Sequence, residues 1–285
     1  MKDAIAVLIP SVIGLLSLPD IASAEMVYAV AEPVALSQSV AYLFEDWCRS
    51  QDRLDENSQH TVSVLMTELG TEDCSEANRR ASTLTLLNLT GQGLKDLRPI
   101  ASFPLLRELV LHGNEITDVT PLASLSNLQR LYLSKNQISD LTPLAGLESL
   151  QFLVLAENDI VDVSALQTLL NLKELYLGHN QISDLTPLSS LISLENLRLN
   201  HNQIEDIGPL SSLVELAKLD LSANQISDIT PLIPLENLEE LNLNRNQIIE
   251  TAALRQMPEL SEVYLYNNPV ENFVCPTTTD AICFR

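Results

Sequence analysis

Three residue types in this sequence could form buried hydrogen bonds, bind metal ions or form disulfides. Asparagines recur every 22 residues without an insertion or deletion, at Asn114, Asn136, Asn158, Asn180, Asn202, Asn224, Asn246 and Asn268. Aspartates recur at the same interval, at Asp96, Asp118, Asp140, Asp162, Asp184, Asp206 and Asp228. Four cysteines lie outside the periodic region, at Cys48, Cys74, Cys275 and Cys283. Amides suit hydrogen bonding, carboxylates suit calcium, and cysteines suit disulfides or zinc.

Each asparagine belongs to one template, LxxLxLxxNxIxDLxPLxxLxx. Nine consecutive units follow it, starting at Leu84, Leu106, Leu128, Leu150, Leu172, Leu194, Leu216, Leu238 and Leu260. A strict period of this length predicts a leucine-rich repeat solenoid over residues 83–268. The alternating LxL stretch predicts a half-buried strand in each unit, and the Thr-Pro pairs predict short 3₁₀ turns that threonine caps. We therefore expect an α/β repeat solenoid, a curved horseshoe with a parallel concave β-sheet and 3₁₀ turns on its convex side.

The asparagines and aspartates are interpreted as structural residues. An amide both donates and accepts, so one per unit can satisfy the buried backbone groups of neighbouring loops, and losing it should cost about 1–3 kcal/mol. The aspartates are expected to bond to turn backbone. Each aspartate stands alone in its unit, without the clustered oxygen ligands that calcium needs. The sequence therefore predicts no metal site in either column.

Both ends of the solenoid need a cover, because a terminal unit has no neighbour to bury its leucines. Residues 37–82 predict a helical N-terminal cap, with a first helix that includes Phe44 and Trp47. A second helix is expected from about Gln59 to Leu69, and a third from Thr71 through Ala77. Trp47 is interpreted as core of this cap. Residues 269–285 predict a C-terminal cap, in which Phe273 and Phe284 cover the last leucines.

The four cysteines flank the solenoid in two pairs and allow three disulfide connectivities. The local pairs Cys48–Cys74 and Cys275–Cys283 are favoured, because a rigid solenoid of nine units holds its two ends far apart. Zinc is the alternative, and it is disfavoured because no C-x-x-C spacing is present.

Residues 1–24 have the features of a secretory signal peptide. Lys2 precedes an apolar run, which ends before an A-x-A cleavage pattern at Ala22-Ser23-Ala24. The run is too short to span a membrane, and no other long apolar segment follows. Residues 25–36 are expected to form a mobile leader. We therefore predict a secreted, periplasmic or cell-surface protein without a membrane span.

Composition and motifs argue against several functions. A net charge of −22 argues against a nucleic-acid partner. No glycine-rich phosphate loop and no nucleophile, base and orienting acid are recognisable, so we expect neither a cofactor nor an enzyme. His179 and His201 occupy equivalent positions of adjacent units, within reach of one metal ion. Two histidines without a third ligand make only a weak metal site.

The 22-residue unit with its D-L-x-P-L segment resembles the internalin and SDS22-like class of leucine-rich repeat proteins. Trp47-Cys48, Gly70-Thr71 and Cys74 resemble the N-terminal cap of exported bacterial members, notably cyanobacterial ones. The segment from Asn268-Pro269 to Cys283 resembles their tail, although the family tail has Cys, a basic residue and then Phe. The resemblance implies protein–protein recognition on the concave sheet and supplies no catalytic residues. Unlike internalin adhesins, the chain is expected to carry no further domain after the repeats and no cell-wall sorting tail, which argues against an adhesin role.

Outward-facing strand positions give a candidate binding site. Four apolar or aromatic residues occupy one column on consecutive units, with Phe152 on the same face: Val110, Tyr132, Val154 and Tyr176. Arg130 and Arg198 are the basic residues among them. Exposed aromatic clusters mark recognition sites, although Tyr and Val are also good strand residues.

These residues predict a binding module for a protein or peptide ligand, expected to be monomeric. The alternative is a structural or self-associating envelope component without a soluble ligand. A third hypothesis, an intracellular phosphatase adaptor of the SDS22 type, fails if residues 1–24 are removed on export.

Overall fold

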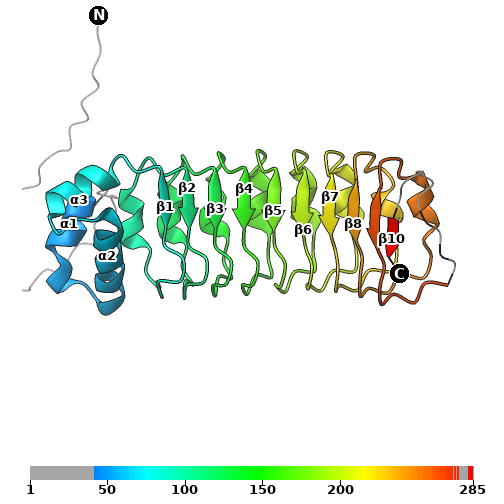
Figure 1. The fold of residues 1–285 in the computed structure, drawn as a ribbon, viewed down its shortest axis with the longest axis horizontal. Coiled ribbons are helices and arrows are strands. Elements are labelled where there is room, and N and C mark those ends of the chain that lie inside the picture. The colour runs from blue at the N-terminus through cyan, green and yellow to red at the C-terminus, as the bar shows by residue number, and fades with distance from the viewer. Residues whose placement is uncertain (1–41, 272, 274, 276–281, 285) are drawn as a thin grey trace, which may run out of the picture. The chain divides into compact units, whose positions relative to one another are not determined.

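The computed structural model describes residues 42–271, 273, 275 and 282–284. The signal peptide and leader predicted for residues 1–36 lie outside these residues. From residue 42 onward, three helices precede a row of short strands in chain order (Figure 1). The predicted parallel-sheet solenoid with 3₁₀ turns is therefore confirmed.

Three short helices form the N-terminal cap: α1 (Phe44–Arg49), α2 (Glu56–Leu69) and α3 (Cys74–Ala81). Helix α2 begins earlier than predicted, because the Asp55 carboxylate accepts two backbone N–H groups of its first turn. It ends where Gly70 takes the left-handed conformation with φ of 65°. The predicted start of the third helix at Thr71 was wrong. Asp73 accepts the backbone N–H of Glu76 at 2.7 Å, so the helix begins at Cys74.

Ten parallel strands of the described residues form one open sheet with order β1 to β10. Their bounds are β1 Leu86–Asn88, β2 Glu108–Val110, β3 Arg130–Tyr132, β4 Phe152–Val154, β5 Glu174–Tyr176, β6 Asn196–Arg198, β7 Lys218–Asp220, β8 Glu240–Asn242, β9 Glu262–Tyr264 and β10 Ile282–Phe284. The register of β1 to β9 pairs equivalent positions of successive units, as in Arg130 with Phe152 and Tyr132 with Val154. Side chains of one repeat position therefore form straight columns across the sheet.

Leucines fill the interior. The central residue of each repeat strand, such as Leu131 or Leu153, is fully buried, whereas its two neighbours on the strand point outward. The chain returns through 3₁₀ turns at η2 Arg98–Ser102, η3 Thr120–Ser124, η4 Thr142–Leu144, η5 Ser164–Thr168, η6 Thr186–Ser190, η7 Gly208–Ser212, η8 Thr230–Leu232 and η9 Ala252–Gln256, and η1 Gln51–Arg53 lies in the cap.

The aspartate column begins these turns. Asp140 Oδ1 accepts the backbone N–H of Thr142 at 2.8 Å, and five further aspartates from Asp118 to Asp228 make the equivalent bond. The predicted cap by threonine was therefore wrong. Threonine is the first residue of the turn and supplies the N–H, while the aspartate two residues earlier accepts it.

The asparagine column joins successive units. Asn180 Nδ2 donates to the carbonyls of Leu155 and Leu177, each at 3.0 Å. Asn180 Oδ1 accepts the N–H of Ile160 at 3.0 Å. One side chain thus satisfies backbone groups of two units, and the same pattern runs from Asn114 to Asn268. We call this set of bonds the asparagine ladder.

The residue before each ladder asparagine is left-handed. Gly113 takes this position with φ of 69°, but seven later units place a residue with a side chain there: Lys135, Glu157, His179, His201, Ala223, Arg245 and Asn267. A left-handed L-residue costs about 1–2 kcal/mol. The ladder bonds and the packed leucines offset this cost in each unit.

The cap is fixed to the first repeats by Arg98. Its guanidinium contacts Asp96 and Asp55 and lies 5.8 Å from the ring centre of Trp47. Ser58 Oγ donates to Asp96 Oδ2 at 2.6 Å, so helix α2 and the first 3₁₀ turn share one network. Trp47 is partly buried against the core, in agreement with its predicted role.

At the other end, β10 adds a strand that the sequence did not predict. Cys283 lies opposite the buried Val263, so the cysteine points inward and Phe284 points outward. Phe284 is 46% exposed and stacks on Tyr264 with ring centres 4.7 Å apart. The prediction that Phe284 covers the last leucines was therefore wrong, whereas Phe273 is partly buried against the core. Disulfides join Cys48 to Cys74 and Cys275 to Cys283.

Replacing one ladder asparagine should destabilise the solenoid. Asn180→Ala leaves the Leu155 carbonyl and the Ile160 N–H without this partner, and the free energy of unfolding should fall by about 1–3 kcal/mol. Urea unfolding followed by circular dichroism measures this change. Gln181→Ala, at the neighbouring exposed position, is the control and should change stability by less than about 0.5 kcal/mol. Equal effects of the two substitutions would contradict the role of the ladder.

Acid should weaken the cap at Asp55. Hydrogen bonds from the Ser58 backbone and hydroxyl and from Arg98 lower the pKa of the Asp55 carboxyl from 3.8 to about 2. Because the folded pKa is depressed, the stabilisation is complete above pH of about 4 and is lost as the pH falls toward 2. The difference in melting temperature between wild type and Asp55→Asn should therefore shrink across this interval. A difference that stays constant from pH 6 to pH 2 would contradict this account.

Candidate functional site

The outward side chains of the strands form the surface that the sequence analysis predicts as the concave face. We call it the sheet face and define it by the first and third residues of β1 to β9. The fold requires the buried central leucine of each strand but makes no such demand on its outward neighbours. Exposed apolar residues at these outward positions therefore indicate a surface that binds a partner.

Three aromatic rings from consecutive strands touch on this face. The ring centres of Tyr132 and Phe152 lie 5.0 Å apart, and those of Phe152 and Tyr176 lie 5.4 Å apart. We call Tyr132, Phe152 and Tyr176 the aromatic cluster. Val110 and Val154 lie beside it in the same column as the tyrosines. All five side chains are of intermediate exposure, so each shields its neighbours and still presents apolar surface to solvent.

Tyr176 is the most constrained member of the cluster. Its hydroxyl donates to Glu174 Oε2 at 2.6 Å and accepts from Asn196 Nδ2 at 3.0 Å. Burial, followed by the hydrogen bond to the Glu174 carboxylate, raises the pKa of the Tyr176 hydroxyl to about 12. The ring is thus locked in place before any partner arrives, which lowers the entropy cost of binding.

Arginine flanks the cluster on both sides. Arg198 places its guanidinium 5.1 Å from the ring centre of Tyr176, in cation–π contact. Arg130 lies beside Phe152 in the register of β3 and β4. Both arginines are exposed, and neither has a carboxylate within 4.0 Å among the described residues. Lysines on and next to the sheet face differ, because each pairs with a glutamate of the following unit: Lys218 on β7, Lys173 just before β5 and Lys135 after β3.

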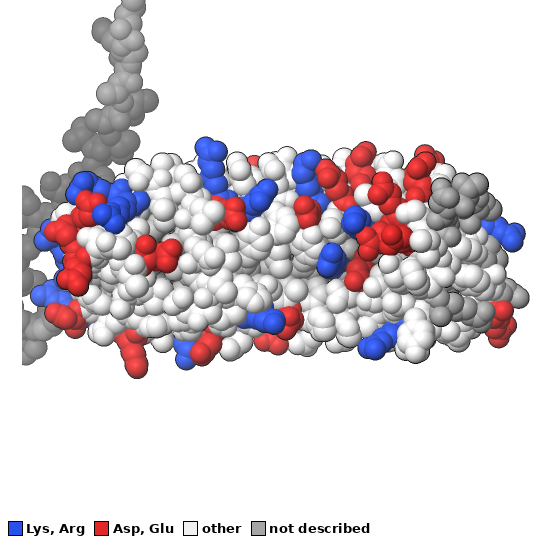
Figure 2. Space-filling model, viewed as in Figure 1, with Lys and Arg blue, Asp and Glu red and all other residues white. Residues whose placement is uncertain are grey.

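Charge is unevenly distributed over the described surface. Figure 2 shows blue and red side chains gathered over β7 to β9, whereas the surface over β3 to β5 is largely white. Strands β3 to β5 carry the aromatic cluster and, within the sheet face, the two charged residues Arg130 and Glu174. A mainly uncharged aromatic area bordered by charge has the composition of a protein-recognition surface.

The two histidines of adjacent units lie together without a third possible metal ligand among the described residues. His179 and His201 stack with ring centres 4.1 Å apart, and burial, followed by repulsion from His179, lowers the pKa of His201. Within the described part of the chain, no group of three His, Cys, Asp or Glu side chains could hold a metal ion.

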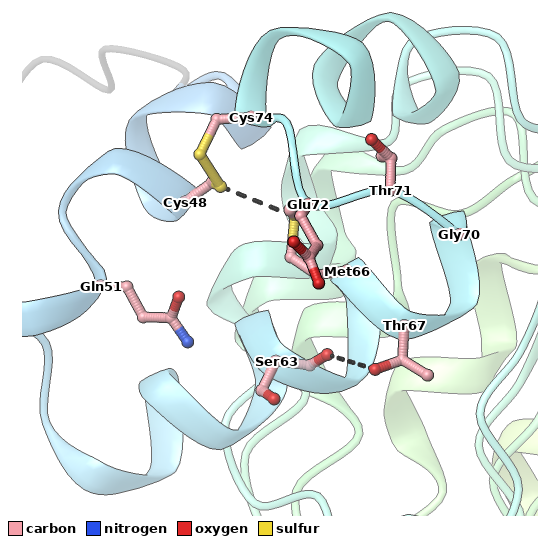
Figure 3. A pocket seen from close by; sticks show the side chains of 9 residues that line it. All are labelled: Cys48, Gln51, Ser63, Met66, Thr67, Gly70, Thr71, Glu72 and Cys74. Carbon is pink, nitrogen blue, oxygen red and sulfur yellow. Dashed lines mark hydrogen bonds between the residues drawn. A yellow bond between two sulfur atoms is a disulfide. The ribbon is translucent and has the colours of Figure 1, made fainter.

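The N-terminal cap carries a recess that sequence reasoning missed. It has a volume of about 670 Å³ and is bordered by the Cys48–Cys74 disulfide, Met66 and the end of helix α2 at Gly70 (Figure 3). Cys48 Sγ lies 3.6 Å from Met66 Sδ, and the disulfide sulfur carries no hydrogen, so this is a packing contact. The polar side chains that line the recess are those of Gln51, Ser63, Thr67, Thr71 and Glu72.

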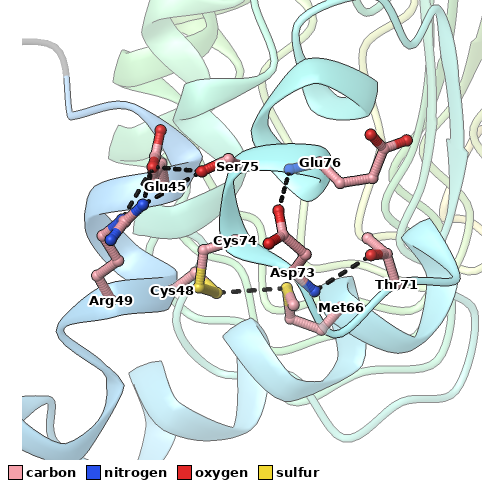
Figure 4. Close-up of a disulfide and its surroundings, with 9 residues drawn as sticks. All are labelled: Glu45, Cys48, Arg49, Met66, Thr71, Asp73, Cys74, Ser75 and Glu76. Atoms are coloured by element: carbon pink, nitrogen blue, oxygen red, sulfur yellow. Dashed lines mark hydrogen bonds and ion pairs between the residues drawn. A yellow bond between two sulfur atoms is a disulfide. The ribbon is translucent and has the colours of Figure 1, made fainter.

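The disulfide ties helix α1 to the start of helix α3. Next to it, Glu45 accepts hydrogen bonds from Arg49 and from Ser75, both at 2.8 Å (Figure 4). Ser75, followed by Arg49, lowers the pKa of the Glu45 carboxyl. These contacts serve to hold the cap together and converge on no common point where a reacting atom would sit.

Comparison with known proteins finds leucine-rich repeat proteins, in agreement with the repeat solenoid described above. A family model described as leucine-rich repeats in two copies matches residues 104–146, 126–168, 148–190 and 192–234. The crystal structure of an internalin C2 from Listeria monocytogenes is 34% identical and has a TM-score of 0.66. The alignment covers 71% of this chain and 91% of the internalin. The chain belongs to the leucine-rich repeat family. Among curated proteins, the search finds no match.

Two further leucine-rich repeat structures resemble the chain. The ectodomain of the plant receptor kinase GASSHO1/SCHENGEN3 from Arabidopsis thaliana, solved in complex with CASPARIAN STRIP INTEGRITY FACTOR 2, is 25% identical with a TM-score of 0.59. That alignment covers 67% of this chain and 25% of the receptor chain. The functional domain of InlJ from Listeria monocytogenes shares the fold, at 21% identity and a TM-score of 0.52, over 85% of this chain and 60% of InlJ.

Leucine-rich repeat folds of this type generally serve as protein-interaction scaffolds, and their typical members are not enzymes. Within the described residues, no helix of this chain is long and apolar enough to cross a membrane.

The raised pKa of Tyr176 gives a direct test of the cluster geometry. Tyrosinate absorbance is titrated for wild type and for Tyr176→Phe, over the range in which circular dichroism shows the fold intact. The component that the substitution removes should titrate near pH 12, because burial and Glu174 disfavour the phenolate. A removed component that titrates near pH 10 would show that Tyr176 is solvated and not bonded to Glu174.

Proposed function

We propose that this leucine-rich repeat protein is an exported binding module, which holds a protein or peptide partner on its sheet face. The observation that carries the proposal is the aromatic cluster, continuous with Arg198, at positions where the fold requires no aromatic residue. Tyr and Arg are the residue types that most often dominate binding energy at interfaces. Val110, Val154 and Arg130 extend the proposed site along the same strands.

Export is part of the proposal. The predicted signal peptide of residues 1–24 supports it, and so do two disulfides, which persist in oxidising compartments. The similarity to an internalin agrees with an exported protein. We further propose membership of the internalin and SDS22-like class, in its exported bacterial form. The protein would act as a monomer in the periplasm, in the medium or at the cell surface, without catalysis.

A capture experiment tests the binding face. Oxidised protein is used as bait for envelope and medium proteins of the source cell, beside a Tyr132→Ala/Tyr176→Ala variant. The variant should lose at least about 90% of the captured partner, since removing two interface aromatics typically costs more than 2 kcal/mol.

The chain offers a matched control for this experiment. Leu170 and Ile192 are 54% and 58% exposed at equivalent positions of adjacent units, outside the strands. A Leu170→Ala/Ile192→Ala variant removes a similar exposed apolar area and should retain the partner. Loss of capture with this control, and retention with the tyrosine variant, would move the site away from the sheet face.

A further inference from the structure

Arg198 stands at the border between two parts of the sheet face. On one side is Tyr176, whose ring it covers. On the other side is a recess of about 120 Å³ lined by Arg198, Lys218, Asp220, Glu240, Asn196 and Asn242. The guanidinium lies over the Tyr176 ring, which restricts its movement, and its N–H groups that do not face the ring remain available to bind a carboxylate in a bidentate manner.

The other charged groups of the recess already have partners. Lys218 Nζ lies 3.0 Å from Glu240 Oε2, and this pairing neutralises both charges. Asp220 Oδ1 accepts the backbone N–H of Ser222 at 2.9 Å. Among the described residues that line the recess, the Arg198 guanidinium is therefore the charged group with neither an ion pair nor a hydrogen bond.

A second atom at the recess lacks a partner. Asn196 donates through Nδ2 to the Tyr176 hydroxyl, which fixes the orientation of its amide. Asn196 Oδ1 is buried and has no hydrogen-bond partner among the residues that the structure describes. The recess thus holds one guanidinium that forms no ion pair with any carboxylate of the described residues. An acidic side chain of a bound peptide would supply that partner.

We infer that the partner of the sheet face is an extended peptide segment in which an acidic side chain binds Arg198 while an apolar side chain rests on the aromatic cluster. This inference rests on the proposed function and specifies the class of its ligand. The sheet face continues past Arg198 over β7 to β9, so the segment crosses the site with its chain unbroken. An acidic side chain, and not a chain end, is therefore the source of the carboxylate.

The strand spacing sets the separation of the two recognised residues. Phe152 on β4 and Arg198 on β6 are two strands apart, about 10 Å at 4.8 Å per strand. An extended peptide advances about 3.3 Å per residue, so the acidic residue lies about three residues from the apolar one. Most of the net charge of −22 lies beyond about 8 Å and is screened at physiological ionic strength, and within the recess Arg198 and Lys218 balance Asp220 and Glu240.

The test is selection of phage-displayed random octapeptides on the oxidised full chain. The displayed segment is fused at its end, so it carries no free terminal carboxylate. Selected peptides should contain an aromatic or branched apolar residue about three positions from Asp or Glu. In synthetic amidated copies, replacing that acid by its amide should weaken binding about tenfold or more, since it removes a charge-assisted hydrogen bond.

Variants of Arg198 separate this inference from the proposed function. Arg198→Gln should bind the acid and amide peptides equally, and Arg198→Glu should select Lys or Arg in place of the acid. Arg245→Gln, which removes an exposed arginine from the neighbouring turn column, is the control and should leave selection unchanged.

The alternative outcomes each have one meaning. Selection of apolar peptides that depend on Tyr176 but show no acid preference overturns the carboxylate inference and leaves the proposed function standing. Binding that requires a free peptide C-terminus, in synthetic copies compared with amidated ones, also overturns the inference. If no selected peptide depends on Tyr176 for binding, both the carboxylate inference and the proposed function are overturned.

Discussion

One buried amide in each repeat holds successive turns of the solenoid together. Each ladder asparagine bonds backbone groups of its own unit and of the unit before it, where water cannot replace the lost partner. The bonds also stabilise the left-handed residue that precedes the asparagine in seven consecutive units. A rigid ladder of this kind explains the constant 22-residue period, because an insertion in one unit would remove its asparagine from register with the next.

A rigid interior leaves the outer surface free to vary. The central strand leucines and the ladder asparagines set the backbone, so exchanging an outward residue on the sheet face leaves the core unchanged. The fold does not require the contacts among the rings of Tyr132, Phe152 and Tyr176. It does not require the position of Arg198 over the Tyr176 ring either. Similar preformed aromatic surfaces bind with low entropy cost, since two torsion angles per ring are already restricted.

Sequence reasoning predicted what the repeat determines. The burial of Leu131 and the bonding of Asn180 follow from period and position, because equivalent residues share one environment in every unit. It was harder to predict which of two neighbouring polar residues caps each 3₁₀ turn. Asp140 and Thr142 are both good capping residues, and only the backbone geometry shows that the aspartate accepts and the threonine N–H donates.

Features that occur once were not predictable from the period. The network around Arg98 joins segments that are distant in sequence, and strand β10 pairs with β9 although its residues do not follow the repeat template. On the sheet face, the column pattern placed Tyr132, Phe152 and Tyr176 near one another. The hydrogen bond that fixes Tyr176 and the cation–π contact of Arg198 with its ring depend on side-chain rotamers that sequence patterns do not encode.

The most direct test of the binding face is hydroxyl-radical footprinting of the protein, alone and with its captured partner bound. Oxidation of Tyr132, Phe152 and Tyr176 should fall several-fold in the complex, while that of Leu170 and Ile192 stays unchanged. Unchanged oxidation of the three rings, with protection at Leu170 and Ile192, would contradict the assignment of the sheet face as the site.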